Sequence, residues 1–184
     1  DFFRQQFAQV TNPPIDPLRE SIVMSLETCV GAERNVFEET PQHADRAILT
    51  SPVLSHSKFQ QLLSIERDGY AVQKISLNYD AAISLRQAVE NVCKEAAEAA
   101  RNGKVILVLS DRDIDQGKLP IPALMATGAV HHHLTNNALR CESNIVVETA
   151  SARDPHHFAC LIGFGATAVY PYLAFDVICD LVRT

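Results

Sequence analysis

The sequence predicts an α/β fold in which parallel βα units occupy residues 69–184 and follow a helical, irregular lead-in over residues 1–68. One continuously apolar, β-branched run at 105–109 is typical of a parallel strand that is covered on both faces, and a further strand is predicted at 145–149. Amphipathic helical patterns alternate with these strands up to the end of the chain. Such alternation indicates a parallel sheet with right-handed crossovers, and we expect the whole chain to form one domain.

Composition and charge exclude several classes of protein. With 184 residues, 47% of them hydrophobic, the chain is long enough to bury a single core. A net charge of -6 and a pI near 5.6 leave no basic footprint for a nucleic acid or an anionic membrane. The sequence contains no run of about 18 apolar residues, so we expect no membrane-spanning helix.

The cysteines and the first residues indicate where the protein belongs. Five cysteines, an odd number without a CxxC pair, are predicted to be reduced thiols of a cytoplasmic protein. Most of them have apolar neighbours in the sequence, so we expect them to be buried. The chain opens with DFFRQQF, without an initiator methionine and already in a helical pattern. We therefore expect it to be a part excised from a longer protein.

The lead-in is expected to contain three helices separated by proline-containing turns. The first ends near Thr11, because the prolines at 13 and 14 lack amide hydrogens and favour extended backbone before them. The second begins at Pro17, since proline fits the first helical position, and it ends at Gly31. Its apolar residues form a stripe that we expect to be buried: Leu18, Ile22 and Leu26. A short third helix is expected around residues 59–63.

Four strands and four helices are expected after the lead-in. The strands are predicted at residues 73–79, 105–109, 145–149 and 168–170. The helices are predicted at residues 85–100 and 121–137, from the Asp154-Pro155 pair onward, and from about residue 173. Four strands cannot close an eight-stranded barrel. The residues alone do not decide between an open sheet and a partial barrel.

The segment GFGATA at 163–168 matches the dinucleotide-binding pattern G-x-G-x-x-G/A as a string. That pattern holds a pyrophosphate only where a strand precedes it and a helix follows, because the N-terminus of the helix binds the phosphate. Here the predicted order is reversed, with a helix before the segment and a strand after it. We therefore expect the glycines to end the helix and to turn the chain into the sheet.

Two groups of consecutive histidines, at 131–133 and 156–157, could suggest a metal site. Consecutive residues of a helix point about 100° apart, whereas helical zinc ligands are spaced three or four residues apart. Neither group by itself can converge on one ion, and packed or exposed histidines are the favoured interpretation. A weaker hypothesis is a metal protein that combines residues of both groups: His131, His133, His156 or His157.

Polar residues follow two of the predicted strands, at the edge where parallel α/β folds bind ligands. The candidate cluster consists of Ser110, Asp111, Arg112 and Glu148, and Asp113 and Tyr170 occupy comparable positions. Asp and Ser are also ordinary loop and cap residues, and no Ser-His-Asp order or glycine-rich phosphate loop accompanies them. One hypothesis is therefore a stand-alone barrel-type enzyme or phosphate-binding domain that uses these four residues.

Six stretches carry a family resemblance: FAQVTNPPIDPLRESIVMSL from residue 7, ERNVFEETPQHA from 33, SPVLS from 51, LSDRD from 109, PALMATGAVHHHL from 122, and VVETASARDPHHFACLIGFGATAVYPYLAF from 146. In order, and over nearly the whole chain, they resemble the central domain of glutamate synthase large subunits. The resemblance implies a partial, rudimentary TIM barrel rather than an open sheet. It also implies a domain with no catalytic residue, cofactor or metal of its own.

The resemblance implies a parent enzyme that makes L-glutamate from L-glutamine and 2-oxoglutarate. NADPH is the expected electron donor, with ferredoxin or NADH in other classes of the family. A glutaminase domain and a synthase domain with FMN and an iron-sulfur cluster are implied elsewhere in the same chain, and a small electron-donating subunit is a further partner. The central domain is expected to join the two domains, to help wall the ammonia channel, to be inactive alone, and to continue beyond residue 184.

Within this resemblance, one loop is the candidate interdomain or channel surface. It consists of Thr11, Asn12, Pro13 and Pro14. Two consecutive prolines hold the backbone nearly rigid, which suits a surface that must present a fixed shape to another domain.

Overall fold

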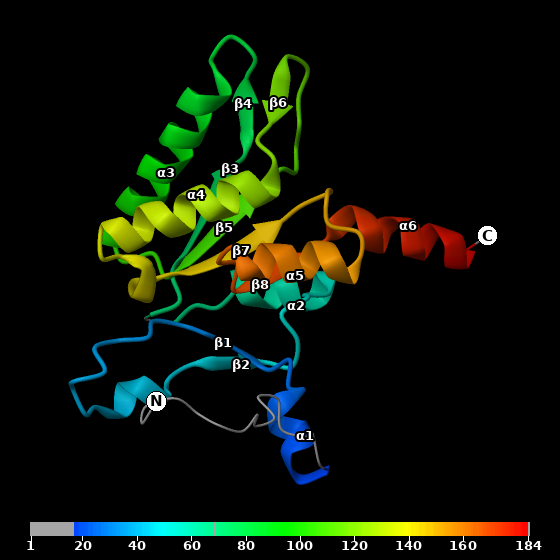
Figure 1. Cartoon of the computed structure of the whole chain (residues 1–184). Coiled ribbons are helices and arrows are strands. Elements are labelled where there is room, and N and C mark those ends of the chain that lie inside the picture. Colours follow the sequence, from blue (N-terminus) through cyan, green and yellow to red (C-terminus); the bar gives the residue numbers. More distant parts are fainter. Residues whose placement is uncertain (1–16, 68, 184) are drawn as a thin grey trace, which may run out of the picture.

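A four-stranded parallel sheet forms the centre of the computed structural model, which describes residues 17–67 and 69–183 (Figure 1). Its strand order is β3-β5-β7-β8. The strands are β3 (Val72–Ser76), β5 (Ile106–Ser110), β7 (Asn144–Glu148) and β8 (Ala168–Tyr170). Each strand therefore pairs with the strand of this sheet that follows it in the sequence. The parallel βα units predicted from the sequence are confirmed.

A helix follows each of these strands. The helices are α3 (Leu85–Arg101), α4 (Ala123–Asn136), α5 (Pro155–Gly163) and α6 (Tyr172–Arg183). Side chains of α3, α4 and α5 share one hydrophobic cluster with Leu107, Leu109 and Val147, which lie on one face of the sheet. Sequential strand order with these helices on a single face is the winding of a partial barrel, because a doubly wound sheet places helices on both faces.

The opposite face of the sheet is covered by the lead-in. Ile106, Val108 and Val146 alternate along the strands with the residues of the first cluster, so they point to the other side. There they share a second cluster with Phe59 and Leu62 of α2 (His56–Leu63). Every residue of β5 and β7 is consequently buried, which explains the consecutive apolar residues at the centre of both strands.

Residues just before α2 also close one edge of the sheet. The amide of Leu54 donates to the carbonyl of Val169 at 2.8 Å, and the amide of Val169 donates to the carbonyl of Pro52 at 2.8 Å. Val53 thereby forms a parallel bridge with Val169 of β8. The backbone hydrogen bonds that β8 would otherwise direct to solvent are made within the chain.

Two small antiparallel pairs lie outside the main sheet (Figure 1). One joins β1 (Thr28–Val30) to β2 (Ala47–Leu49), and the other joins β4 (Asn78–Asp80) to β6 (Lys118–Pro120). The β4–β6 pair projects beyond the carboxyl ends of the central strands. Two short 3-10 turns, η1 (Pro41–Ala44) and η2 (Arg140–Glu142), complete the described elements.

The second predicted helix of the lead-in was wrong in length and in its buried stripe. The structure has α1 only at Pro17–Val23, and β1 follows before Gly31. Leu18, Ile22 and Leu26 are exposed to 89%, 78% and 64% rather than buried. Pairing of residues 28–30 with β2 takes this stretch out of the helix, a tertiary contact that local propensity does not reveal. The first predicted helix lies outside the described residues.

The expectation of buried cysteines was also largely wrong. Cys93 is buried and Cys160 half-buried, whereas Cys29, Cys141 and Cys179 are exposed. Cys29 lies opposite Ile48 in the β1–β2 pair, and both side chains point outward because neighbours along a strand alternate between faces. Apolar neighbours in the sequence therefore did not imply burial. None of the helices in the described parts of the chain is both long and apolar enough to span a membrane.

We predict that packing of α2 on the sheet contributes strongly to stability. Phe59 is 1% exposed and stacks on Tyr170 with ring centroids 4.5 Å apart. Phe59→Ala should lower the free energy of unfolding by about 3–5 kcal/mol, because it removes a buried aromatic ring and leaves a cavity. Urea denaturation measures this loss. Phe37→Ala is the matched control, since Phe37 is 92% exposed, and its effect should stay within about 0.5 kcal/mol. Equal effects of the two substitutions would contradict the prediction.

Candidate functional site

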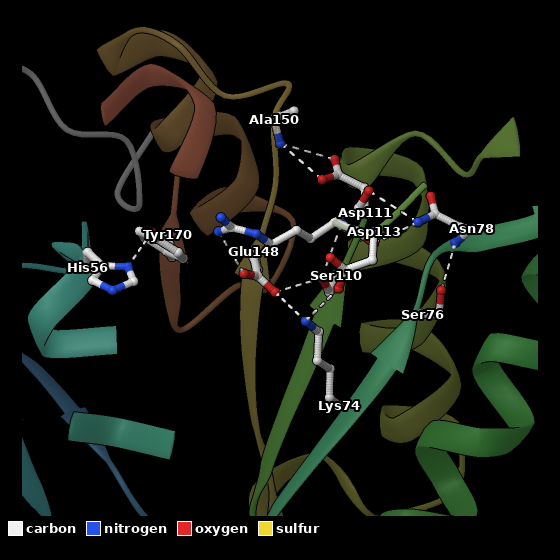
Figure 2. A network of polar contacts seen from close by, with 11 residues as sticks. His56, Lys74, Ser76, Asn78, Ser110, Asp111, Asp113, Glu148, Ala150 and Tyr170 are labelled. Carbon is white, nitrogen blue, oxygen red and sulfur yellow. Dashed lines mark hydrogen bonds and ion pairs between the residues drawn. The ribbon is translucent and has the colours of Figure 1, made fainter. Parts of the chain in front are cut away.

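The carboxyl ends of β5 and β7 bring a serine and a carboxylate together (Figure 2). Ser110 ends β5, Glu148 ends β7, and the two residues are register partners in the parallel ladder. The Ser110 hydroxyl donates to Oε2 of Glu148 at 2.6 Å. The Glu148 side chain is only 3% exposed, so its charge requires partners within the protein.

Two cations supply that compensation. Nζ of Lys74 lies 3.0 Å from Oε2 of Glu148, and Nη1 of Arg112 lies 3.5 Å from Oε1. Lys74 also lies 3.7 Å from Oδ2 of Asp113. The amide of Arg112 donates to Oγ of Ser110 at 3.2 Å, so this hydroxyl both donates and accepts within the cluster. Both oxygens of the buried carboxylate are thus engaged.

Asp111 ties the loop after β5 to the loop after β7. Its Oδ2 accepts a hydrogen bond of 2.5 Å from the Thr149 hydroxyl. Its Oδ1 accepts one of 3.0 Å from the amide of Ala150 (Figure 2). From the other side, Nδ2 of Asn78 donates to the carbonyls of Asp111 and Arg112 at 3.2 and 2.8 Å. These bonds hold the three loops at this edge in one arrangement.

Aromatic rings border the cluster on the side of β8. The Tyr170 hydroxyl and Nδ1 of His56 are 2.9 Å apart, which joins the last residue of β8 to the first residue of α2. The guanidinium of Arg112 lies over the ring of Tyr172, 4.6 Å from its centroid, a cation–π contact. Burial raises the pKa of Tyr172, and the nearby Asp111 carboxylate raises it further, so this phenol stays protonated at neutral pH.

The structure brings together the four polar residues singled out at the strand ends: Ser110, Asp111, Arg112 and Glu148. It adds Lys74, His56 and Asn78, which the sequence analysis missed. Lys74 lies two residues before the end of β3 and reaches the edge only through its long side chain. No local pattern marks such a residue. The candidate surface Thr11, Asn12, Pro13 and Pro14 lies outside the described residues.

The charged groups at this edge are paired with one another: Lys74 and Arg112 both contact Glu148. The Ser110 hydroxyl donates a hydrogen bond to the Glu148 carboxylate, and two cations contact the same carboxylate. Phosphate recognition would need these cations free, whereas both are directed at Glu148. The arrangement is suited to joining strands and loops.

The GFGATA segment has the order of elements that the sequence predicts. Helix α5 ends at Gly163, and β8 begins at Ala168. Gly165 has a φ of 112°, and a Cβ at this position would collide with the ring of His131. The segment is therefore a turn that packs closely on α4, and its glycines serve backbone conformation and close approach.

Arg140 joins this turn to the histidine-rich helix. Its Nε donates to Nδ1 of His131 at 3.1 Å, its Nη2 to the Gly165 carbonyl at 3.0 Å, and its Nη1 to the Ser143 carbonyl at 2.7 Å. Burial lowers the pKa of His131, and the charge of Arg140 lowers it further, so this imidazole is neutral and acts as an acceptor. Within residues 17–67 and 69–183, no three His, Cys, Asp or Glu side chains are grouped to hold a metal ion.

The fold and this edge define a class of protein: an α/β domain of partial-barrel winding whose strand-end residues are paired with one another. Comparison with known proteins then gives the family. The family model described as "Glutamate synthase central domain" matches residues 1–184. The chain belongs to this family, and the resemblance found in the sequence is confirmed.

Similar proteins agree with this assignment. The chain is 46% identical to a chloroplastic ferredoxin-dependent glutamate synthase of Oryza sativa subsp. japonica, over 96% of the chain and 11% of that protein. It is 44% identical to a ferredoxin-dependent glutamate synthase of Pyropia yezoensis, over 96% of the chain and 12% of that protein. It is 41% identical to a glutamate synthase [NADH] of Saccharomyces cerevisiae, over 100% of the chain and 9% of that protein.

The chain thus spans 9–12% of the length of these relatives and is similar to one domain of much larger proteins. Their names give ferredoxin or NADH as the electron donor. The expectation of NADPH receives no support from these three names.

We predict that the Glu148 network stabilises the edge of the sheet. Glu148→Gln keeps the shape of the side chain but removes the charge that holds Lys74 and Arg112. The free energy of unfolding should fall by about 1–3 kcal/mol, because both cations are partly exposed and regain some hydration. Asp113→Asn is the control, since Asp113 is 79% exposed, and it should change stability by no more than about 0.5 kcal/mol. A Glu148→Gln protein as stable as the wild type would refute this role.

We also predict that His131 makes stability depend on pH. Its pKa in the folded protein is lowered, so below about pH 6.5 the unfolded chain binds more protons at this residue than the folded one. The stabilising contribution is complete above that pH and is lost as the pH falls below it. His131→Gln keeps an acceptor for Arg140 and should flatten the decline between about pH 6.5 and 5 in urea denaturation. His132→Gln, at a neighbouring exposed residue, should keep most of the decline in stability between these pH values.

Proposed function

We propose that the chain is the scaffold domain that joins the glutaminase and FMN synthase domains of a glutamate synthase and forms part of the wall of its ammonia channel. The observation that carries this proposal is the internally paired edge of the sheet. Barrel enzymes place their catalytic residues at the carboxyl ends of the strands. Here that edge is an ion network around Glu148, and α2 covers the sheet face that a full barrel would enclose.

The proposed parent enzyme makes L-glutamate from L-glutamine and 2-oxoglutarate. Ferredoxin or NADH is the proposed electron donor, in line with the names of the relatives. The proposed FMN and iron-sulfur cluster belong to other domains of the parent, and a small electron-donating subunit is a further proposed partner. The contribution proposed for this domain is geometric: it holds two reaction centres at a fixed distance.

Exposed apolar side chains support contacts with neighbouring domains. Tyr172 and Phe175 of α6 are only partly buried against the second cluster, none of its side chains is fully buried, and the helix extends away from the sheet (Figure 1). A helix of 12 residues with little packing is marginal in water, so a partner surface would stabilise it. The exposed apolar residues of α6 include Leu173, Val177, Ile178 and Val182. At the other end of the domain, Val36 and Phe37 are exposed to 79% and 92%. We propose that neighbouring domains of the parent cover these regions.

The alternative, a stand-alone barrel-type enzyme or phosphate-binding domain, is less well supported. It would use Ser110, Asp111, Arg112 and Glu148, but a phosphate would have to displace the Glu148 carboxylate from both cations. The mass of the natural product separates the two functions. A single product close to 20.3 kDa would favour the alternative.

The proposed channel role predicts that the candidate surface at residues 11–14 couples glutamine hydrolysis to glutamate formation. In the full-length parent, Pro13→Ala combined with Pro14→Ala should allow ammonia to escape, because a loop of greater freedom seals a domain interface less well. The measurement is the ratio of glutamine hydrolysed to glutamate formed by reductive amination, which should rise above the wild-type ratio. Pro41→Ala, at an exposed proline of η1, is the control. An unchanged ratio in the double variant would argue against a channel role for this loop.

A further inference from the structure

A groove of about 390 Å³ lies between the first turns of α4 and α5 and the loop after β7. Its lining combines apolar side chains with a thiol and two imidazoles: Leu124, Ser151, Ala152, His156, His157, Cys160 and Leu161. None of these residues belongs to the Glu148 network. The groove therefore needs an explanation of its own.

Within the groove, Cys160 and His156 form a pair. They are one turn apart on α5, and Sγ of Cys160 lies 3.6 Å from Nε2 of His156. The neighbouring imidazole is held differently, since Nδ1 of His157 lies 3.4 Å from Asp154 and accepts from the amide of Arg153 at 3.2 Å. His156 is thus the imidazole that faces the thiol.

A second groove contains Cys93 together with His132 and His133, but the Cys93 thiol is buried and makes no described hydrogen bond to either histidine. Burial raises the pKa of this thiol, which disfavours the reactive thiolate. Cys29, Cys141 and Cys179 are exposed. In the parts of the chain that the structure describes, Cys160 is the one cysteine with a histidine nitrogen within hydrogen-bond distance. Exposure, a neighbouring base and an apolar wall are the conditions for a selective reactive thiol.

We propose that this groove is a covalent binding site for apolar carbon electrophiles, such as α,β-unsaturated carbonyl compounds, with Cys160 as the nucleophile and His156 as the base. Nε2 of His156 takes the thiol proton, and Sγ forms a bond to the β-carbon of the electrophile. The carbon–carbon double bond becomes a single bond, and the α-carbon receives a proton from His156. No group leaves and no oxidant is required. Leu124, Ala152 and Leu161 supply the surface for the apolar part of the molecule.

This site is independent of glutamate formation, and it concerns modification of the domain rather than its proposed scaffold role. N-ethylmaleimide is a suitable probe because it reacts by this same addition. At neutral pH and limiting reagent, mass mapping of peptides from the folded chain should find the adduct first on Cys160. In urea the five thiols should react at similar rates, which shows that the selectivity depends on the fold.

Two matched variants test the base. His156→Gln should slow modification of Cys160 by roughly tenfold, because the proton acceptor is lost. His157→Gln should leave the rate within about twofold, because its side chain contacts Asp154 and Arg153 instead. A first adduct on Cys29, Cys141 or Cys179, or equal rates in the two variants, would overturn the proposal.

The apolar wall is tested separately. The rate at Cys160 relative to that at exposed Cys179 should increase when N-cyclohexylmaleimide replaces a hydroxyethyl maleimide. Leu124→Ser should reduce this preference, since Leu124 lines the groove and is 37% exposed. A preference that does not depend on the apolar group would show a reactive thiol without a binding groove and would overturn the assignment of a ligand class.

Discussion

A parallel sheet with apolar residues on both faces must be covered on both faces, and the rest of this structure follows from that constraint. Helices α3, α4 and α5 cover one face because right-handed crossovers place them there. A full barrel would bury the other face in its interior, but four strands do not enclose an interior. The lead-in provides the cover instead, with Phe59 and Leu62 of α2 on that face. The lead-in and the βα units therefore share one core.

The polar residues at the carboxyl edge of the sheet are paired with one another. Glu148 is a buried carboxylate at the end of a central strand, and removing either cation would leave charge poorly compensated. The network joins β3, β5 and β7 at one point, while Asp111 and Asn78 fix the loops above them. Residues that could bind a ligand in an enzyme are used here to hold strands and loops in register. These cross-links make the carboxyl edge of the sheet rigid.

Much of the βα region could be predicted from the sequence, because its signals are local. The run at 105–109 and the Asp154-Pro155 pair identified β5 and the start of α5 correctly. The lead-in could not be predicted in this way. Pairing of β1 with β2 depends on residues about 20 positions away in the sequence, and the exposure of Leu18 and Ile22 is invisible to a periodic pattern. At the site, Ser110 and Glu148 followed from the rule that strand ends meet. Lys74 did not, since its place depends on the reach of a flexible side chain.

The closed edge at β8 has a consequence for the life of the domain inside a long polypeptide. Open parallel sheets are prone to add strands from other molecules, and such edge-to-edge pairing leads to aggregation. The backbone of residues 52–54 occupies this edge through two hydrogen bonds to Val169. At the opposite edge, β3 carries the charged, exposed Lys74. A border occupied by the chain's own backbone and a border that carries a charge both disfavour pairing with strands of other polypeptides.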